Sequence, residues 1–321
     1  MKGLRRTIGP FAPVRCAPRV ARTVTLAGVA AVTATLAAIA AILVVVPASA
    51  PTGAAAAGAP APKVIVLSAP GYPGNTLQAQ PMMDAFAKSA GRAAGWPEGK
   101  LGAVYYETEK GGLDRLAADD AAMALVPLPF FLKHGTALGL KPWLEVERDS
   151  GGTEVWSLVA KKGAIASPAS LDGWELIGKP GYAPAFVRGP VLRDWGAVPP
   201  TTRITFSAAI LSVLRRAAAG EKIAAVLDGE QTASLASLPF ANDLEVVARS
   251  KPLPTSVVCI VRDHLAPAEV EGLAKALLRL HETEEGREVL KTMRMKRFLP
   301  VEAKRLEAAQ RAFRESAGPA K

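Results

Sequence analysis

The chain has 321 residues, of which 50% are apolar and 21% are charged, which is enough to bury one large core or two modest ones. Its formal charge is +10 at pH 7, but residues 1–62 hold six basic residues and no acidic one, which leaves +4 for the rest. This diffuse excess, without a polybasic tract interleaved with aromatic residues, argues against nucleic-acid binding.

The N-terminal segment is expected to direct the chain across a membrane. Residues 1–22 form a basic region that stays in the cytoplasm, and residues 23–47 form an uncharged signal or transmembrane helix long enough to span a bilayer. Ala48-Ser49-Ala50 looks like a signal-peptidase site, whereas Pro51 and the length of the apolar run oppose cleavage. A cleaved signal peptide and a retained inner-membrane anchor both stay open, and either one makes the body periplasmic.

A linker rich in alanine and proline covers residues 48–62 and precedes the folded body. Beyond it the chain has a single cysteine, Cys259, inside an apolar run. The body therefore forms no internal disulfide, and Cys259 is expected to be a small core residue.

Strands alternate with helices in the first part of the body. Apolar runs bounded by Gly, Pro and Asn predict three strands, and the helical spacing of apolar residues predicts two helices between them. The strands are 63–69, 101–106 and 123–126, and the helices are 77–96 and 111–120. This alternation is typical of a mostly parallel sheet covered on both faces.

A second, smaller α/β set follows two strands, Trp143–Glu147 and Val155–Lys161, which are predicted to form a hairpin around a Gly-rich turn. The second set comprises strands 174–177, 203–206, 223–227 and 244–248 and helices 185–195, 208–219 and 231–238. Thr255–Val261 returns the chain to the first set, and three helices, 267–281, 283–293 and 300–313, complete the body. Two lobes joined by crossing strands leave a cleft between them, and small ligands bind in such clefts.

Three segments of the body carry a resemblance to a known family. Ser167–Gly173 is similar to the family's S-x-x-x-L-x-G entry into a second lobe, and Gly220–Asp228 is similar to its G-x-x-D-A-A-x-x-D strand. Lys251–Val301 has the order of its closing segment, namely P-x-P, a strand, L-x-P, a helix, E-G-x-x-x-L and F-x-P. In these features residues 63–315 resemble the type 2 periplasmic solute-binding proteins of ABC importers, and among them the phosphate/phosphite/phosphonate-binding branch.

The resemblance implies a two-lobe α/β fold in which each lobe is a mostly parallel sheet flanked by helices. Residues 63–162 with 255–321 would form lobe 1, and residues 163–254 would form an inserted lobe 2. The implied function is to bind a small anionic or zwitterionic ligand in the cleft and to present it to an ABC permease. The alternative is a membrane-anchored sensor or interaction module that uses the same fold without transport.

Loops at the carboxyl ends of the strands bind the ligand in this architecture, so they supply the candidate site residues. These candidates are Tyr72, Asn75, Glu107, Pro127, Tyr182, Ala183, Ser207 and Asp228. Tyr72 would stack on the ligand or hydrogen-bond to it. Asp228 would hold an ammonium group or cap the helix that follows it.

One stretch departs from the family pattern. Gly181–Phe186 matches the turn in which phosphonate-binding members cradle an anion with hydroxyl and N–H groups. Here Tyr182 supplies the only hydroxyl, and Pro184 removes an N–H. This departure argues against phosphonate as the ligand.

Nothing in the sequence points to an enzyme. The three histidines, His134, His264 and His281, show no paired metal spacing, and the chain has no P-loop, G-x-S-x-G, C-x-x-C or G-x-G-x-x-G motif. We therefore expect no catalytic residue, no metal and no cofactor.

Overall fold

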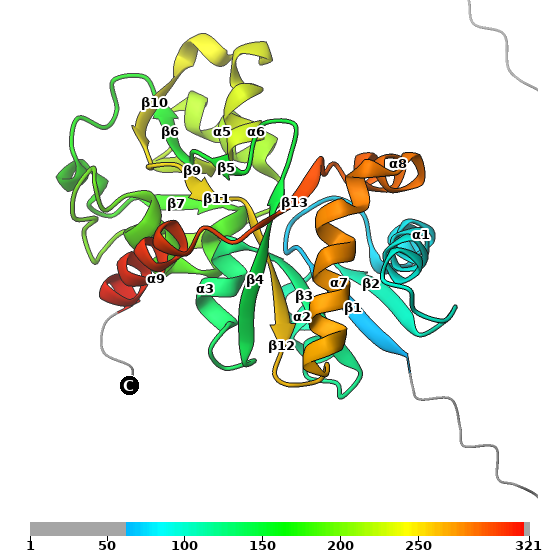
Figure 1. The fold of residues 1–321 in the computed structure, drawn as a ribbon. Helices are drawn as coiled ribbons and strands as arrows, with labels where there is room; N and C mark the ends of the chain where they lie inside the picture. Colours follow the sequence, from blue (N-terminus) through cyan, green and yellow to red (C-terminus); the bar gives the residue numbers. More distant parts are fainter. Residues whose placement is uncertain (1–61, 318–321) are drawn as a thin grey trace, which may run out of the picture. The chain divides into compact units, whose positions relative to one another are not determined.

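The computed structural model describes residues 62–317, which form two mixed α/β lobes, each built around one sheet (Figure 1). The predicted basic region, apolar helix and linker fall on residues 1–61 or border them, and so lie outside the described part of the chain. Within residues 62–317, none of the helices combines the length and the hydropathy that a membrane span requires.

The first lobe has a six-stranded sheet in the order β13-β4-β12-β3-β1-β2. Its strands are β1 (Lys63–Ser68), β2 (Leu101–Tyr106), β3 (Ala121–Pro127), β4 (Leu140–Glu147), β12 (Ser256–Val261) and β13 (Arg297–Pro300). β1 runs parallel to β2 and β3, whereas β12 is antiparallel to β3 and β4, and β13 is antiparallel to β4. The carboxyl ends of β1, β2 and β3 therefore meet at one edge of the sheet.

Helices cover both faces of this sheet because β1 is apolar on both faces. Ile65 and Leu67 pack with α1 (Thr76–Ala93), α7 (Pro267–Arg279) and α8 (Glu284–Thr292), whereas the alternate residues Val64 and Val66 pack in a second apolar cluster on the other face. That second face also carries α2 (Glu109–Leu116) and α3 (Leu128–His134).

The second lobe has a five-stranded sheet in the order β10-β6-β9-β7-β8. Its strands are β6 (Ser157–Lys161), β7 (Glu175–Gly178), β8 (Arg203–Phe206), β9 (Ile223–Leu227) and β10 (Leu244–Arg249). β7 lies parallel to β8 and β9, and β6 lies antiparallel to β9 and β10. The helix α5 (Ile210–Ala219) packs on one face of this sheet. Short helical segments connect the strands: the helices α4 (Pro184–Phe186) and α6 (Gly229–Ala233), and the 3-10 turns η1 (Pro168–Leu171), η2 (Lys179–Tyr182), η4 (Leu235–Ser237) and η5 (Ala241–Asp243). A further 3-10 turn, η6 (Leu280–Glu282), joins α7 to α8 in the first lobe.

Two crossing segments join the lobes and lie side by side. β5 (Thr153–Glu154) leads from β4 to β6, and β11 (Leu253–Pro254) leads from β10 to β12. The two pair antiparallel, with Leu253 opposite Glu154. The first crossing follows the turn that contains Gly151 and Gly152, whereas the second crossing contains two prolines, Pro252 and Pro254.

The predicted hairpin of residues 143–161 is wrong. β4 pairs with β12 and β13 in the first lobe, and β6 pairs with β9 and β10 in the second. The turn exists, since Arg148 and Gly151 form an isolated antiparallel bridge. It leads out of one sheet and into the other instead of folding the chain back on itself.

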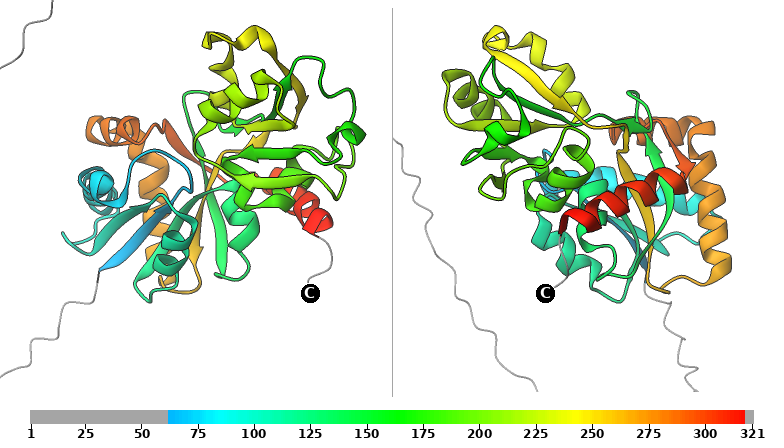
Figure 2. Two further views of the ribbon diagram at one scale, coloured as in Figure 1. Left: turned by 180° about the vertical axis from the view of Figure 1, so that it is seen from behind. Right: turned by 90° about the vertical axis from the view of Figure 1, so that its left-hand side faces the viewer.

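The helix α9 (Ala303–Ala317) crosses to the second lobe and packs against α4 and the π-helical turn η3 (Val187–Val191) (Figure 2). We expected all residues after 254 to lie with the first lobe, and α9 differs from that expectation. Gly189 permits the close approach, because a Cβ there would overlap the main-chain oxygen of Ala312. The predicted helix of residues 185–195 is broken at this point, where Pro190 cannot donate a backbone N–H.

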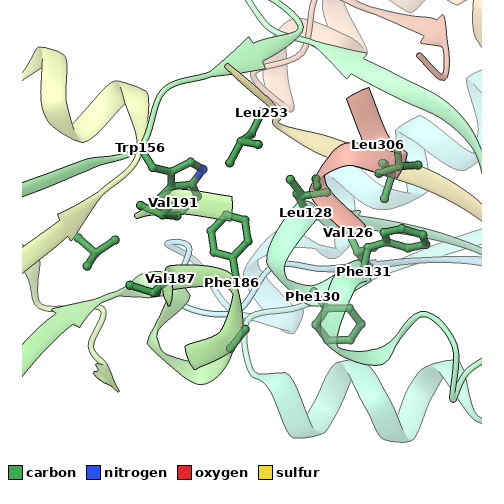
Figure 3. Close-up of a cluster of buried hydrophobic side chains, with 14 of the residues drawn as sticks. Val126, Leu128, Phe130, Phe131, Trp156, Phe186, Val187, Val191, Leu253 and Leu306 are labelled. Carbon is green, nitrogen blue, oxygen red and sulfur yellow. The ribbon is translucent and has the colours of Figure 1, made fainter. Parts of the chain in front are cut away.

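An apolar cluster spans the junction of the two lobes (Figure 3). Trp156 and Leu253 come from the crossing region, Phe186 from the second lobe, Leu128 from the first, and Leu306 from α9. The Trp156 and Phe186 rings meet edge to face, with centroids 5.3 Å apart. On this side of the junction the lobes are packed together by buried apolar surface.

Candidate functional site

Tyr72 lies in the loop from β1 to α1, and hydrogen bonds to the backbone of that loop hold it in place. Gly71, with φ +81°, donates its N–H to Glu107 O at 3.1 Å, and the Tyr105 hydroxyl donates to Tyr72 O at 3.2 Å. The loop packs closely on the second lobe, since a Cβ on Gly71 would lie 2.9 Å from the Phe206 ring. Tyr72 therefore reaches from the first lobe into the junction.

Lys179 and Asp228 form an ion pair on the second lobe. They directly follow the neighbouring parallel strands β7 and β9, and Lys179 Nζ lies 3.1 Å from Asp228 Oδ2, with side chains 14% and 5% exposed. Asp228 also caps α6, because its Oδ1 accepts from Gln231 N at 2.8 Å. Lys179 Nζ lies 4.1 Å from the centre of the Tyr72 ring, so the pair meets the first-lobe loop.

The first crossing adds Arg148 and Glu154 to this group. The Arg148 guanidinium lies 5.8 Å from the centre of the Tyr72 ring and 3.4 Å from Glu230 Oε1. Burial raises the pKa of Glu154 to about 8; the negative charge of Asp228 adds to this shift, and the positive charge of Arg148 opposes it. Burial also raises the pKa of Tyr72, so its phenol stays protonated.

These five residues, Tyr72, Arg148, Glu154, Lys179 and Asp228, are called the junction cluster here. They come from the first lobe, the second lobe and the crossing between them. With Glu154 protonated at neutral pH, the cluster offers two cations, one paired carboxylate and two neutral O–H groups. Such a set can bind an anionic group and can also accept from a ligand N–H.

A second polar contact joins the lobes beside Tyr182. Lys133 Nζ, on α3, donates to Tyr182 O and to Glu109 Oε1, both at 2.6 Å, and His134 Nε2 lies 2.6 Å from the same carboxylate oxygen. Although burial opposes ionisation of Glu109, hydrogen bonds from Lys133 and His134 lower the pKa of its carboxyl. The Tyr182 hydroxyl is buried and has no hydrogen-bond partner among residues 62–317.

A cavity of about 300 Å³ opens beside the junction cluster and shares Tyr72 and Arg148 with it. Its wall is formed by the ends of β1 and β3, by α1, by the loop between α8 and β13, and by Glu230 of the second lobe. It lies at the carboxyl ends of the parallel strands, which is where open α/β sheets bind ligands.

Comparison with known proteins decides the family. Residues 113–306 match the family described as the periplasmic substrate-binding protein of ABC phosphonate transporters. The chain belongs to this family. Its members are substrate-binding components of transporters and not enzymes, and they are periplasmic. No curated protein matches the chain in sequence.

Solved structures share the fold of this phosphonate-transporter family member at low sequence identity. XAC2383 from Xanthomonas citri bound to ATP is 15% identical, with a TM-score of 0.62, and the match covers 81% of this chain and 100% of that one. PhnD1 from Prochlorococcus marinus in complex with methylphosphonate is 14% identical, with a TM-score of 0.54 over 79% and 98%. A binding protein component of an ABC phosphonate transporter from Pseudomonas aeruginosa is 15% identical, with a TM-score of 0.53 over 81% and 91%. The resemblance and the two-lobe fold inferred from the sequence are thus confirmed.

The structure brings together four of the eight residues predicted for the site. Tyr72 and Asp228 belong to the junction cluster, Pro127 lines the cavity, and Tyr182 lies where the lobes meet. Ligand contact by any of them stays a prediction.

The other four predicted residues serve the local backbone or a neighbouring side chain. Asn75 caps α1 by accepting from Gln78 N at 2.9 Å, and Ser207 Oγ accepts from Ala209 N at 3.1 Å. Glu107 Oε2 lies 3.4 Å from the Thr76 hydroxyl, and Ala183 is buried, with its N–H bonded to Pro180 O.

Residues 181–186, whose sequence departs from the anion-binding turn of the family, also form no regular helix head in the structure. Lys179–Tyr182 is a 3-10 turn, and α4 has only three residues. A stretch this short, with Pro180 and Pro184 in it, presents no row of free N–H groups. The positive charge at the junction comes instead from Lys179 and Arg148.

Sequence reasoning missed Arg148, Glu154 and Lys179. Lys179 follows β7 directly, so the rule that selected the other strand ends also points to it. Arg148 and Glu154 flank the turn that was assigned to a hairpin, and a hairpin turn would have left them away from any cleft.

Proposed function

We propose that the protein binds a small anionic or zwitterionic ligand between its two lobes and presents the ligand-bound form to an ABC permease. The observation that carries the proposal is the junction cluster, in which Tyr72, Arg148 and Lys179 converge from three separate parts of the fold. Only a compound held between the lobes touches all three parts at once. Membership of a family of substrate-binding proteins supports the same assignment.

The two cations supply the attraction for an anionic group. Arg148 is the more available of the two, because its contact with Glu230 is 3.4 Å long and the Glu230 side chain is 48% exposed. An anion that replaces this contact gains a partner that is 19% exposed and therefore weakly screened. Protonated Glu154 can donate a hydrogen bond to the same anion.

An amino group on the ligand would find acceptors in Asp228 and Tyr72. Asp228 is already paired with Lys179 and keeps carboxylate lone pairs beyond that contact. Ligand binding would hold the lobes together, and the lobes would turn relative to one another at the paired crossings β5 and β11. Residues 23–47 would export the body or anchor it in the inner membrane.

Isothermal titration calorimetry of the full chain in lipid nanodiscs tests the proposal. The titrants are phosphate, methylphosphonate, 2-aminoethylphosphonate, sulfate and glutamate, with empty nanodiscs as the blank. We expect saturable heat with at least one anion, and a loss of affinity of about tenfold or more in Arg148→Met.

Arg215→Met is the matched control, because Arg215 is an exposed residue of α5 that belongs neither to the junction cluster nor to the cavity lining. Its affinity should equal that of the wild type. Absence of heat with every titrant, or equal affinity in Arg148→Met and wild type, contradicts the proposed function.

A further inference from the structure

Three methionines, called the cavity methionines here, line the cavity beside the junction cluster. Met82 lies on α1, and Met293 and Met295 lie in the loop between α8 and β13. All three residues are only partly buried, so they keep contact with solvent. The other two methionines of residues 62–317, Met83 and Met123, are 0% exposed and fill the core, which is the usual task of methionine. The described chain thus holds one set of thioethers against a cavity and another away from solvent.

The end of α8 fixes the position of two of these residues. Arg294 adopts φ +56° after the helix, and its N–H donates to Lys291 O at 2.9 Å. The Met295 N–H donates to Leu290 O at 2.8 Å. These two bonds form the Schellman motif that closes many helices, with arginine at the position where glycine is usual. Met293 and Met295 flank that position, so a turn held by two hydrogen bonds carries both residues to the cavity.

Within residues 62–317, sulfur reaches solvent only at this cavity. Cys259 is 0% exposed, and burial raises the pKa of its thiol, so the thiolate that oxidants attack does not form. Met83 and Met123 are shielded as well. A small oxidant that enters from the medium and attacks sulfur therefore meets the cavity methionines first.

Oxidation would change what the cavity wall offers to its neighbours. Arg148 and Arg294 line the same cavity, whose volume is about 300 Å³, so a polar group formed on the wall has guanidinium groups near it. A thioether is a weak acceptor, whereas a sulfoxide is polar and its oxygen accepts hydrogen bonds. A sulfoxide on this wall would accept from Arg148 and so compete with an anion bound by the junction cluster, to which Arg148 also belongs.

We propose that Met82, Met293 and Met295 form an oxidation site, and that their conversion to sulfoxides weakens anion binding by the junction cluster. The effect on binding rests on the proposed function, whereas the site itself does not. With hypochlorous acid as the oxidant, the thioether sulfur attacks the oxygen with an electron pair, the S–O bond forms, the O–Cl bond breaks, chloride leaves and the proton passes to water. Sulfur is oxidised by two electrons and chlorine is reduced by two. Methionine sulfoxide reductases reverse the change, with one enzyme for each sulfoxide epimer.

Mass spectrometry of peptides from the full chain tests the site. The chain is held in nanodiscs of saturated lipid, which does not consume the oxidant, and is treated with limiting hypochlorite before free methionine stops the reaction. We expect the cavity methionines to gain oxygen at least about tenfold faster than Met83 and Met123, because oxidation follows exposure. Equal rates for the two sets, or slower oxidation at the cavity, refute the site.

Calorimetry on the same samples, with phosphate, methylphosphonate and sulfate as probes, tests the effect on binding. We expect oxidation to lower the affinity by about tenfold, the fold-change that corresponds to one hydrogen bond to a charged group, and the reductases to restore it. In a triple variant with Met82→Leu, Met293→Leu and Met295→Leu, the affinities before and after hypochlorite should be equal. Met83→Leu is the control, because Met83 is the buried neighbour of Met82 on α1, and its affinity should fall on oxidation as in the wild type.

The outcomes separate this inference from the proposed function. If the untreated protein binds an anion and selective oxidation leaves the affinity unchanged, the effect on binding is refuted and the proposed function stands. If the untreated protein binds none of these anions, the proposed function and the effect on binding are both contradicted, and the peptide rates still decide the site. If the triple variant does not fold, a loss of affinity in the wild type that the reductases fail to reverse refutes the effect.

Discussion

Replacing Glu154 by glutamine should make the protein more stable, and increasingly so as the pH rises. Glu154 lies in β5, in the crossing between the lobes, and burial raises its pKa to about 8 from an ordinary value of 4.5. In the unfolded chain the carboxyl ionises at the ordinary value. Between these two values the folded protein holds a proton that the unfolded chain releases, so stability falls as the pH rises through this window.

The size of the effect follows from the two pKa values. Each unit of difference corresponds to about 1.4 kcal/mol, and integration between pH 5 and pH 9 gives a loss of roughly 4 kcal/mol in the wild type. The Glu154→Gln variant has no carboxyl to ionise at this position. Its free energy of unfolding should therefore exceed that of the wild type by an amount that grows by roughly 4 kcal/mol over the same pH range.

Urea unfolding followed by tryptophan fluorescence measures this difference. All five tryptophans of the chain lie in the described part, at positions 96, 143, 156, 174 and 195. Both proteins would be unfolded at pH 5, 7 and 9, with Glu307→Gln as the control, since Glu307 is an exposed residue of α9. Equal differences between variant and wild type at the three pH values would refute the assignment of a raised pKa to Glu154.

Two further changes test how the lobes are held together. Lys133→Met removes the donor that reaches Tyr182 O at 2.6 Å, so hydrogen–deuterium exchange over residues 179–186 should become severalfold faster, whereas exchange in α5 should equal that of the wild type. Unchanged exchange at residues 179–186 would mean that this contact does not restrain the second lobe. Gly189→Ala forces a Cβ against the Ala312 main chain and should lower the free energy of unfolding by about 1–3 kcal/mol. Gly272 lies at an open position of α7, so Gly272→Ala should leave the free energy of unfolding unchanged or raise it by up to about 1 kcal/mol. If both glycine variants changed the free energy of unfolding equally, α9 would not be closely packed on η3.

The sequence was most informative where elements follow from local patterns. The strands β1, β2 and β3 are short apolar runs closed by Gly, Pro or polar residues, and the structure has a strand at each. Thr283 caps α8 through a bond from Gly286 N at 3.0 Å, as its place before two glutamates suggests. In these segments a few neighbouring residues decide the conformation.

The pairing of strands that lie far apart in the chain could not be predicted from the sequence. A Gly-rich turn between two apolar runs looks the same whether it closes a hairpin or leads to another lobe, so β4 and β6 were paired wrongly. β13 has only four residues and pairs with β4 at a separation of about 150 positions, as for Arg297 and Glu147. No local pattern reports such a partner.

The residues of the candidate site likewise divide into those that a local sequence pattern identifies and those that only the folded structure identifies. Tyr72 and Asp228 could be selected because each directly follows a predicted strand. Glu154 could not, because its raised pKa depends on burial and on the charge of Asp228, which is remote in sequence. The role of Arg148 likewise depends on where the crossing carries it.

The paired crossings differ in mechanical stiffness. Pro252 and Pro254 fix φ at two positions of the second crossing, whereas Gly151, at φ +112°, and Gly152 leave the approach to the first crossing pliable. When the lobes move, the backbone dihedral angles should change mainly in the glycine-containing approach to the first crossing, and the proline-containing second crossing should act as the fixed axis. Arg148 directly precedes this flexible segment, so an anion bound to its guanidinium would act on the part of the chain that changes conformation most easily.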